Sequence, residues 1–383
     1  MSEIAQQLQS REDRAKGRKI VEKLAAELVR RGFTEEEVGR LSRISMWQGL
    51  TKNDDGDAEI HDLYGFQLAP SWDDGPDWPV VQPAAPVKVP AIRVQKRNAV
   101  HRTVILPDPQ IGYRRTTDGD MIATHDERAM DVALQIAKSA KPDRIVNLGD
   151  TLDLPEWSSK FLVLPEFVLT TQPTLDRAHR FLAEQTAIAP EVLMIGGNHD
   201  DRIGKSIAKN AMAAFRLRRA EQPNSFPVLS IPFLLRLEDL GVQYVGAYPA
   251  GRIELYAGAE GQTPLVAVHG EKLDVVKVAK TERQSFVQGH IHRIAYHSET
   301  YEVRGQPETV SAFSPGCLCR VDGAVPSTKS GEDEHGVPVQ RWENWQQGMA
   351  VVSEFENGRW EMEMIRIHDG VAVWRDKEYV TNL

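Results

Sequence analysis

The chain has 383 residues, of which 41% are hydrophobic and 26% charged, an ordinary composition for a soluble globular protein. Its net charge of −9 argues against general binding of polyanions by the whole surface, although a local basic patch is compatible with it. The sequence has neither an apolar run of about 18 residues nor an apolar signal core near Met1, so we expect no membrane partner and a cytoplasmic location.

Residues 1–69 are predicted to form a small N-terminal helical segment. Apolar residues at helical spacing predict a first helix, and its buried face would be made by Ile20, Leu24 and Leu28. Gly32 is a natural end for this helix.

A second helix is predicted to follow directly. Thr34 and Glu37 have the spacing of a capping box, and the helix would carry Val38, Leu41 and Ile44. We favour a helical pair that docks on a partner or mediates oligomerisation. A helix-turn-helix that binds DNA is the alternative.

Residues 70–98 are predicted to be a proline-rich linker, or an arm laid over the next domain, because prolines recur there with tryptophans between them. The acidic stretch at 53–57 is predicted to be a solvated turn, since it lacks the full ligand spacing and the closing glutamate of a calcium loop. The remaining residues, 99–383, are predicted to form the main domain.

This main domain alternates between predicted strands and helices. Short apolar runs predict strands at 103–106, 144–148, 192–195, 265–268 and 285–287. Helical spacing predicts helices at 124–140, 174–188 and 205–219. After a polar surface insertion at 321–340, a closing β-meander is predicted at 349–355, 360–367 and 371–374. The pattern indicates a layered α/β sandwich.

The two cysteines of the chain, Cys317 and Cys319, are separated by one residue. At that spacing they are a poor disulfide pair and at most half of a zinc site. We therefore expect free thiols in a reducing compartment.

A polar motif follows each of five predicted strands. In chain order, the motifs are Asp108-Pro109-Gln110, Gly149-Asp150-Thr151-Leu152-Asp153, Gly196-Gly197-Asn198-His199-Asp200, His269-Gly270 and Gly289-His290-Ile291-His292. Ligands of open α/β sheets bind outside the carboxyl ends of the strands, so we expect these motifs to converge.

The order and spacing of the five motifs resemble those of the calcineurin-like metallophosphoesterase superfamily, over about residues 102–315. The resemblance implies an α/β fold in which a layered β-sandwich of two mixed sheets is flanked by helices. It also implies a hydrolase with two divalent metal ions, which activate water and neutralise a phosphoryl group. Manganese is the favoured ion, and iron or zinc are the alternatives.

The resemblance implies a metal ligand in every motif. Asp150 would bridge the two ions. The first site would be completed by Asp108 and His292, and the second by Asn198, His269 and His290.

Gln110 departs from the superfamily pattern, which has a histidine at this position. An amide oxygen is a weaker donor than imidazole towards transition metals, and Gln110 could coordinate directly, act through water or not bind. We expect weaker affinity at the first site, a preference for manganese or another hard metal, and retained activity.

His199 is the predicted acid–base residue, because it follows the implied ligand Asn198 and would lie at the rim of the centre. Asp153 is predicted to accept a hydrogen bond from His199 and so to orient the ring, with a helix-start cap as the alternative. Arg202 is a candidate phosphate clamp, and the alternative is an exposed arginine at a helix start.

The favoured substrate is nucleic acid, because the predicted basic helix at 205–219 starts beside the site and could meet a phosphate backbone. A solvated basic face is the alternative reading of that helix. The N-terminal segment and the proline-rich arm resemble those of phage-encoded phosphoesterases grouped with SbcD-type nucleases, which would place the protein in the host cytoplasm.

Two other functions stay open at this point. One is a small-substrate phosphatase or a cyclic nucleotide phosphodiesterase with the same metal chemistry. The other belongs to a different class, a non-catalytic metal-binding interaction module, and Gln110 is the only residue that supports it.

Overall fold

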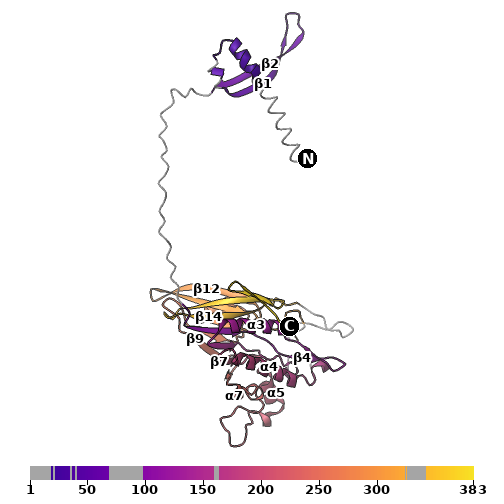
Figure 1. Ribbon diagram of the computed structural model, residues 1–383, viewed down its shortest axis with the longest axis vertical. Coiled ribbons are helices and arrows are strands. Elements are labelled where there is room, and N and C mark those ends of the chain that lie inside the picture. The colour runs from indigo at the N-terminus through magenta and orange to yellow at the C-terminus, as the bar shows by residue number, and fades with distance from the viewer. Residues whose placement is uncertain are drawn as a thin grey trace. The chain divides into compact units, whose positions relative to one another are not determined.

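The computed structural model describes residues 19, 22–34, 37–38, 41–68, 98–158, 164–323, 325 and 342–383. The chain divides into two compact units, Met1–Arg93 and Val94–Leu383, and Figure 1 draws both. Within the described ranges, no helix is long and apolar enough to cross a membrane.

The N-terminal unit contains the first predicted helix and the start of the second, where residues 37–38 are helical. Residues 22–30 are helical, and Leu24 and Leu28 are buried as expected. Thr34 and Glu37 form the predicted capping box. The Thr34 N–H donates to Oε2 of Glu37 at 2.9 Å, and the Glu37 N–H donates to Oγ1 of Thr34 at 3.2 Å.

The predicted second helix through Leu41 and Ile44 is wrong, so residues 1–69 are not helical throughout. Both residues lie in strand β1 (Leu41–Lys52), which pairs antiparallel with β2 (Ala58–Leu68) around the turn at 53–57. Two or three apolar residues are too few to distinguish a helix from a strand, and the cross-strand ladder with β2 decides for the strand. The linker predicted at 70–98 lies outside the described residues, except for its last residue.

An eight-stranded mixed sheet forms the centre of the second unit. In spatial order its strands are β17 (Lys377–Val380), β16 (Val371–Trp374), β15 (Trp360–His368), β14 (Gln347–Glu354), β3 (His101–Leu106), β6 (Arg144–Asn147), β7 (Glu191–Ile195) and β8 (Gln243–Val245). The strands β3, β6, β7 and β8 run parallel, and the meander from β14 to β17 closes antiparallel on β3.

A second, five-stranded sheet has the spatial order β12 (Ile294–Val303), β13 (Gln306–Pro315), β11 (Ser285–Gln288), β10 (Leu265–Val268) and β9 (Arg252–Tyr256). A small separate hairpin is formed by β4 (Tyr113–Arg115) and β5 (Met121–Ala123). Sequence reasoning missed the hairpin of β12 and β13, because polar side chains alternate through β12 and leave no apolar run.

The two large sheets pack face to face through one apolar layer. Ile105, Val146 and Ile195 come from the eight-stranded sheet, and Ala267 and Val287 come from the five-stranded sheet. All five are fully buried. This is the sandwich core that aligned sheets form when their inner faces interdigitate.

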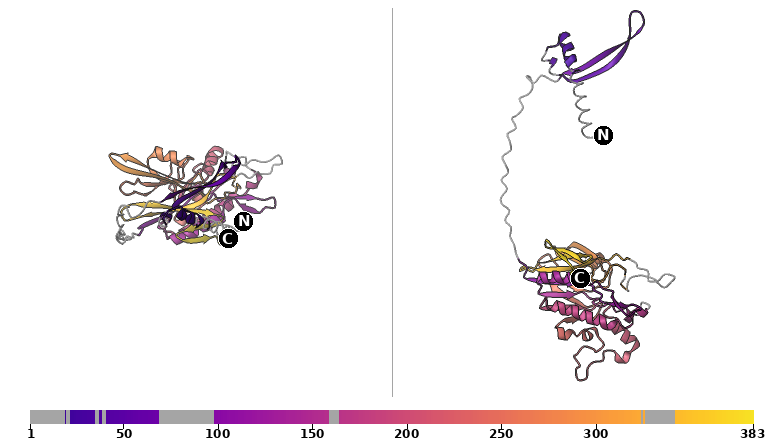
Figure 2. Two further views of the ribbon diagram at one scale, coloured as in Figure 1. Left: turned by 90° about the horizontal axis from the view of Figure 1, so that it is seen from above. Right: turned by 45° about the vertical axis from the view of Figure 1, so that its right-hand side comes forward.

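Helices cover the outer faces of the sandwich. The helices are α3 (Glu127–Ala140), α4 (Thr171–Thr186), α5 (Arg202–Asn210), α6 (Ile231–Leu234), α7 (Leu237–Leu240) and α8 (Val275–Glu282), with single 3-10 turns at Pro155–Trp157, Pro165–Phe167 and Met212–Ala214. The helices α3, α4 and α5 pack on the eight-stranded sheet, and α8 packs on the other sheet. Figure 1 and the right-hand view in Figure 2 place α4, α5 and α7 on the side of the domain opposite β12. The predicted layered α/β architecture is therefore confirmed.

The helix predicted at 205–219 is shorter than expected, and most of the predicted insertion at 321–340 lies outside the described residues. The helix predicted at 205–219 ends at Asn210, and Arg216 has a left-handed backbone with φ of 60° that no helix accommodates. The insertion predicted at 321–340 lies outside the described residues, apart from 321–323 and 325.

Candidate metal centre

The predicted metal ligands lie just beyond the carboxyl ends of strands in both sheets. These strands are β3, β6, β7, β10 and β11, and the residues that follow them are respectively Asp108 and Gln110, Asp150, Asn198, His269, and His290 and His292. A cavity of about 330 Å³ opens there, and its lining includes Gln110, Asp150, Asn198, His199, His290 and His292. The five motifs therefore converge as the strand-end argument predicted.

One group of donors gathers around His292. The Oδ1 atom of Asp108 lies 3.3 Å from Nε2 of His292. The side-chain amide of Gln110 lies 3.3 Å from the same ring nitrogen. The carboxylate of Asp108 is fixed by the main-chain N–H of His290, which donates to its two oxygens at 2.9 and 3.1 Å. These contacts bring together the three residues assigned to the first site.

A second group gathers around His269. Its Nδ1–H donates to the main-chain oxygen of Leu148 at 2.9 Å, which leaves Nε2 as the nitrogen that faces the cavity. That Nε2 atom lies 3.0 Å from Oδ1 of Asn198 and 3.4 Å from Oδ2 of Asp150. Asp150, His269 and His290 offer donor atoms within 4.8 Å of one another. The four residues assigned to the second site are therefore neighbours.

Five of these donors have a backbone conformation that L-residues rarely adopt. Their φ angles are positive: Asp108 (42°), Gln110 (45°), Asp150 (47°), His290 (68°) and His292 (53°). Such conformations cost on the order of 1–3 kcal/mol each, and they concentrate at functional sites. The backbone thus marks these residues independently of their side-chain chemistry.

Two glycines allow the motif loops to approach the carboxylates. A Cβ atom at Gly197 would overlap the carboxylate of Asp150, and a Cβ atom at Gly289 would overlap that of Asp108. The glycines of the third and fifth motifs are therefore needed for close approach to the donors of the first two.

The charges of this centre are strongly coupled. Burial alone would lower the pKa values of His269 and His292, but the carboxylates of Asp150 and Asp108 outweigh burial and raise both to about 9. Burial alone would raise the pKa of Asp150, and the charges of His199 and His269 instead lower it well below its ordinary value. Asp150 acts on both histidines, so it lies where a bridging ligand would be needed.

The donor set fits divalent cations. The Oε1 atom of Gln110 is buried and has no hydrogen-bond partner within the described structure, a state that a buried carbonyl oxygen avoids unless it meets a donor or a cation. Carboxylate, amide and imidazole donors together suit manganese, iron or zinc. A pair of such ions, when bound, supplies an activated water and positive charge for phosphoryl oxygens.

His199 and Asp153 form the predicted pair. The Nδ1 atom of His199 lies 2.9 Å from Oδ1 of Asp153, and its main-chain N–H donates to Oδ1 of Asp150 at 2.7 Å. The ring lines the cavity with its Nε2 atom 3.7 Å from Oδ2 of Asp150. His199 is therefore oriented by one carboxylate and placed beside the other.

Arg202 has a different position from either interpretation of the sequence. It is buried at the start of α5, so the exposed-arginine alternative is wrong. Its guanidinium donates to the main-chain oxygen of Asp153 and, at 3.3 Å, to Oδ1 of the same residue. Arg202 does not line the cavity and instead holds Asp153 in place.

Asp200 is a site residue to which sequence reasoning gave no role. Its buried carboxylate accepts the main-chain N–H groups of Gly197 at 2.9 Å and Leu152 at 3.1 Å, so it joins the loops after β7 and β6. Burial and the charge of Asp150 raise its pKa to about 6. The signal available in the sequence was its place at the end of the third motif.

Trp345 also borders the centre, from a segment outside the five motifs. It lines the cavity together with Glu343 and Asn344. Its ring meets the imidazole of His292 edge to face, with 4.3 Å between the centroids. Nothing in the local sequence predicts this position, because it depends on the path of the segment that leads into β14.

No model of a known protein family and no curated protein matches the sequence. Among solved structures, 22 chains match. One is the crystal structure of Chaetomium thermophilum Vps29, which has 10% sequence identity and a TM-score of 0.27, with 74% of this chain and 97% of that chain covered. A match at this TM-score is too weak to carry an argument about function.

Proposed function

We propose that the protein is a dinuclear metal-dependent phosphodiesterase that hydrolyses nucleic acid. The observation that carries the proposal is the convergence of seven donors from five strand ends beside a histidine that a carboxylate orients. The first ion would be held by Asp108, Gln110 and His292, and the second by Asn198, His269 and His290. Asp150 would be shared by both.

The residues of this chain divide the chemical work. The ions that these donors would hold would supply an activated water and positive charge for the phosphoryl oxygens. His199 protonates the leaving alkoxide, because its Nε2 faces the cavity while Nδ1 is engaged by Asp153. Arg202 keeps Asp153 in place and so acts on the proton transfer indirectly.

Basic side chains in and beyond α5, with an exposed phenylalanine among them, support a polymeric substrate. Between residues 205 and 219 the exposed basic residues are Lys205, Lys209, Arg216, Arg218 and Arg219. Phe215 and Leu217 lie between them and are 38% and 55% exposed. Positive charge that follows the phosphates, together with aromatic faces for the bases, is the combination that binds single strands.

Hydrolysis by the manganese-loaded protein tests the proposal. We would compare bis-p-nitrophenyl phosphate, p-nitrophenyl phosphate and labelled single- and double-stranded DNA, each with the parent and with His199→Ala. Cleavage of the diester and of DNA by the parent is the expected result, with DNA cleavage lost in the variant while metal content is kept. Cleavage of the monoester alone would identify a small-substrate phosphatase instead. If the metal-loaded protein hydrolysed none of these substrates, the result would favour the non-catalytic module.

A charge-reversal pair tests the nucleic-acid part separately. Arg216→Glu/Arg219→Glu should raise KM for DNA and flatten its salt dependence, because the number of phosphate contacts falls. It should leave hydrolysis of bis-p-nitrophenyl phosphate unchanged. Arg359→Glu is the matched control, since Arg359 follows the end of β14 that pairs with His101, at the far end of β3 from Asp108. Equal KM values for DNA in the two variants would contradict the proposal that these arginines bind nucleic acid.

A further inference from the structure

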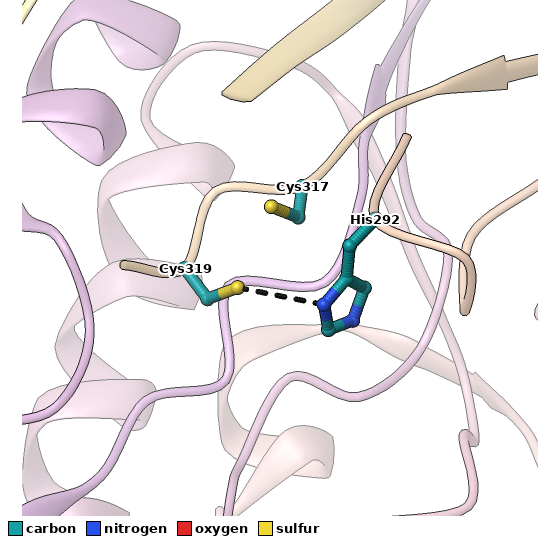
Figure 3. A group of neighbouring side chains, drawn as sticks. All are labelled: His292, Cys317 and Cys319. Carbon is teal, nitrogen blue, oxygen red and sulfur yellow. Dashed lines mark hydrogen bonds between the residues drawn. The ribbon is translucent and has the colours of Figure 1, made fainter. Parts of the chain in front are cut away.

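Behind the candidate metal centre lies a second cluster of metal-binding side chains, which the proposed hydrolysis does not use. Cys317 and Cys319 are both free and fully buried. Their sulfur atoms and one ring nitrogen of His292 lie within 4.8 Å of one another. Figure 3 shows both thiols on the same side of the imidazole, with Sγ of Cys319 3.8 Å from Nδ1 of His292.

The cluster uses the nitrogen of His292 that the candidate centre leaves over. The Nε2 atom faces Asp108 and Gln110, both at 3.3 Å, whereas Nδ1 faces the thiols. The two edges of one ring therefore face two chemically different environments. One is rich in oxygen donors, and the other contains sulfur.

The backbone holds the two cysteines ready. The backbone bends at Leu318, which lies between the two cysteines and enters the main apolar core. The backbone of Cys317 forms an isolated β-bridge with that of Gln347, and the backbone of Cys319 forms one with that of His125. A thiol pair fixed in this way needs little rearrangement to bind an ion.

The side chains around the two thiols are apolar, so they favour a bound ion whose charge the thiolates cancel. Val325 and the partly buried Trp345 and Val321 pack around both cysteines. A charge buried among apolar side chains is costly unless it is compensated, and two thiolates would cancel the charge of one divalent ion. Two sulfurs and an imidazole are donors that zinc prefers over manganese.

We propose that Cys317, Cys319 and Nδ1 of His292 form a zinc-type site, separate from the oxygen-rich centre and joined to it through the His292 ring. When ions occupy both sites at once, the ring has released both N–H protons to solvent and bridges the two ions as an imidazolate. Three protein ligands leave a fourth position on a tetrahedral ion. The main-chain oxygen of Gln346, which lies 3.5 Å from Sγ of Cys317, is a polar atom available for it. The sequence alone suggested half of a zinc site, and the fold supplies the third donor.

Cobalt substitution tests this site in the full-length protein. A single Co²⁺ ion bound by the thiols should give a near-ultraviolet thiolate-to-metal charge-transfer band, which zinc should abolish by displacement. The band should disappear in Cys317→Ser and in Cys319→Ser. Val325→Ala is the matched control, because it loosens the same apolar cluster without removing a sulfur, and it should retain the band.

X-ray absorption of the zinc-loaded parent protein gives a readout that needs no variant. Sulfur scattering at about 2.3 Å from zinc is the expected result. Scattering from nitrogen and oxygen alone, with no charge-transfer band for cobalt, would overturn the proposal. Both readouts report sulfur ligation and are independent of hydrolysis, so they stand or fall separately from the proposed phosphodiesterase activity.

Discussion

The imidazole of His199 lies between two carboxylates, with Nδ1 at 2.9 Å from Oδ1 of Asp153 and Nε2 at 3.7 Å from Oδ2 of Asp150. Asp153 is itself held by the guanidinium of Arg202. This arrangement fixes the ring orientation and leaves Nε2 directed at the cavity. In the proposed reaction, Asp153 would therefore act through His199, as a positioning residue.

Removing the proton donor should affect substrates unequally. We expect His199→Gln to lower kcat by about 10²–10⁴-fold for DNA, whose leaving alkoxide needs a proton. The loss should be much smaller for bis-p-nitrophenyl phosphate, because nitrophenolate leaves without one. Measuring kcat on both substrates checks this, with His101→Gln as the control at the other end of β3. Equal losses on both substrates would argue that His199 acts on the metals or on binding.

Asp153→Asn should weaken the same step without changing metal content. The amide cannot hold the ring in the required tautomer, so kcat for DNA should fall by about 10²-fold while KM changes little. The acidic and basic limbs of the pH–rate profile should also move, which loss of folding alone would not produce. An unchanged profile together with an unchanged kcat would remove Asp153 from the mechanism.

Gln110 should limit the affinity of the first site. We expect Gln110→His to tighten binding of zinc and iron more than that of manganese, because imidazole is the better donor to those ions. Gln110→Ala should weaken the binding of one ion and leave the other unchanged. Calorimetric titration with each metal would measure both effects, with Gln262→Ala as a control whose amide bonds Trp360 instead. Identical isotherms for Gln110→Ala and the parent would show that the amide does not coordinate.

Metal loading should depend steeply on pH. Asp150 and Asp108 raise the pKa values of His269 and His292 to about 9, so both rings are protonated at neutral pH when no ion is bound. A divalent ion must displace these protons, and its affinity should therefore rise as the pH increases towards about 9. Proton release on manganese binding, measured in buffers of different ionisation enthalpy, checks this. Binding without proton release would mean that these nitrogens are not ligands.

Gly197 should tolerate no side chain. Gly197→Ala would drive a methyl group into the Asp150 carboxylate, so we expect loss of metal binding and lower stability. Gly204→Ala is the matched control, since Gly204 lies in α5 with only Oδ1 of Asp201 near its new methyl group, at 3.7 Å. That control should raise stability by about 0.5–1 kcal/mol, the usual gain in a helix. Similar unfolding curves for the two variants would contradict the overlap.

Glu127 should stabilise the domain in a pH-dependent way. Burial would raise its pKa, but hydrogen bonds from Arg177 and His125 lower it from 4.5 to about 2. A lowered carboxyl pKa gives stability that is complete above the unfolded value of 4.5 and is lost as the pH falls towards about 2. Because Glu127 is partly exposed, we discount the effect and expect Glu127→Gln to cost about 1 kcal/mol at neutral pH.

Urea unfolding at neutral pH and near pH 3 would measure the Glu127 effect. The difference between Glu127→Gln and the parent should shrink at the lower pH. Glu361→Gln provides the control, because its pair with Arg359 is exposed on both sides. A constant difference at both pH values would show that charge plays no part.

The sequence anticipated the layered α/β architecture and the place where the candidate donors meet, but not the hairpin of β1 and β2 or that of β12 and β13. One rule, that donors gather beyond the carboxyl ends of strands, predicts that Asp108, Asp150 and His269 come together; Asp108 accepts the main-chain N–H of His290, and Nε2 of His269 lies 3.4 Å from Asp150. The pairing of His199 with Asp153 was predicted from the place of Asp153 three residues after Asp150, and the two side chains lie 2.9 Å apart. Short motifs carry this information because the strand before each one fixes its position.

Other features depended on contacts between distant segments. Leu41 and Ile44 read as a helix because their pairing with β2 is invisible in the local pattern. The approach of Cys319 to His292, and the burial of Arg202 against Asp153, arise only when the loops pack together. Local spacing contains no trace of such contacts, so sequence reasoning could not supply them.

The pairing of β3 has a consequence for the order in which this protein can be made. Asp108 follows a strand whose Ile105 pairs with Val146 on one side and with Ala350 on the other. A ribosome that has passed His292 has already produced every proposed ligand of the candidate metal centre, yet β3 still has an open edge until β14 emerges. A nascent or truncated chain that ends before residue 347 would therefore contain the whole donor set on an unfinished sheet.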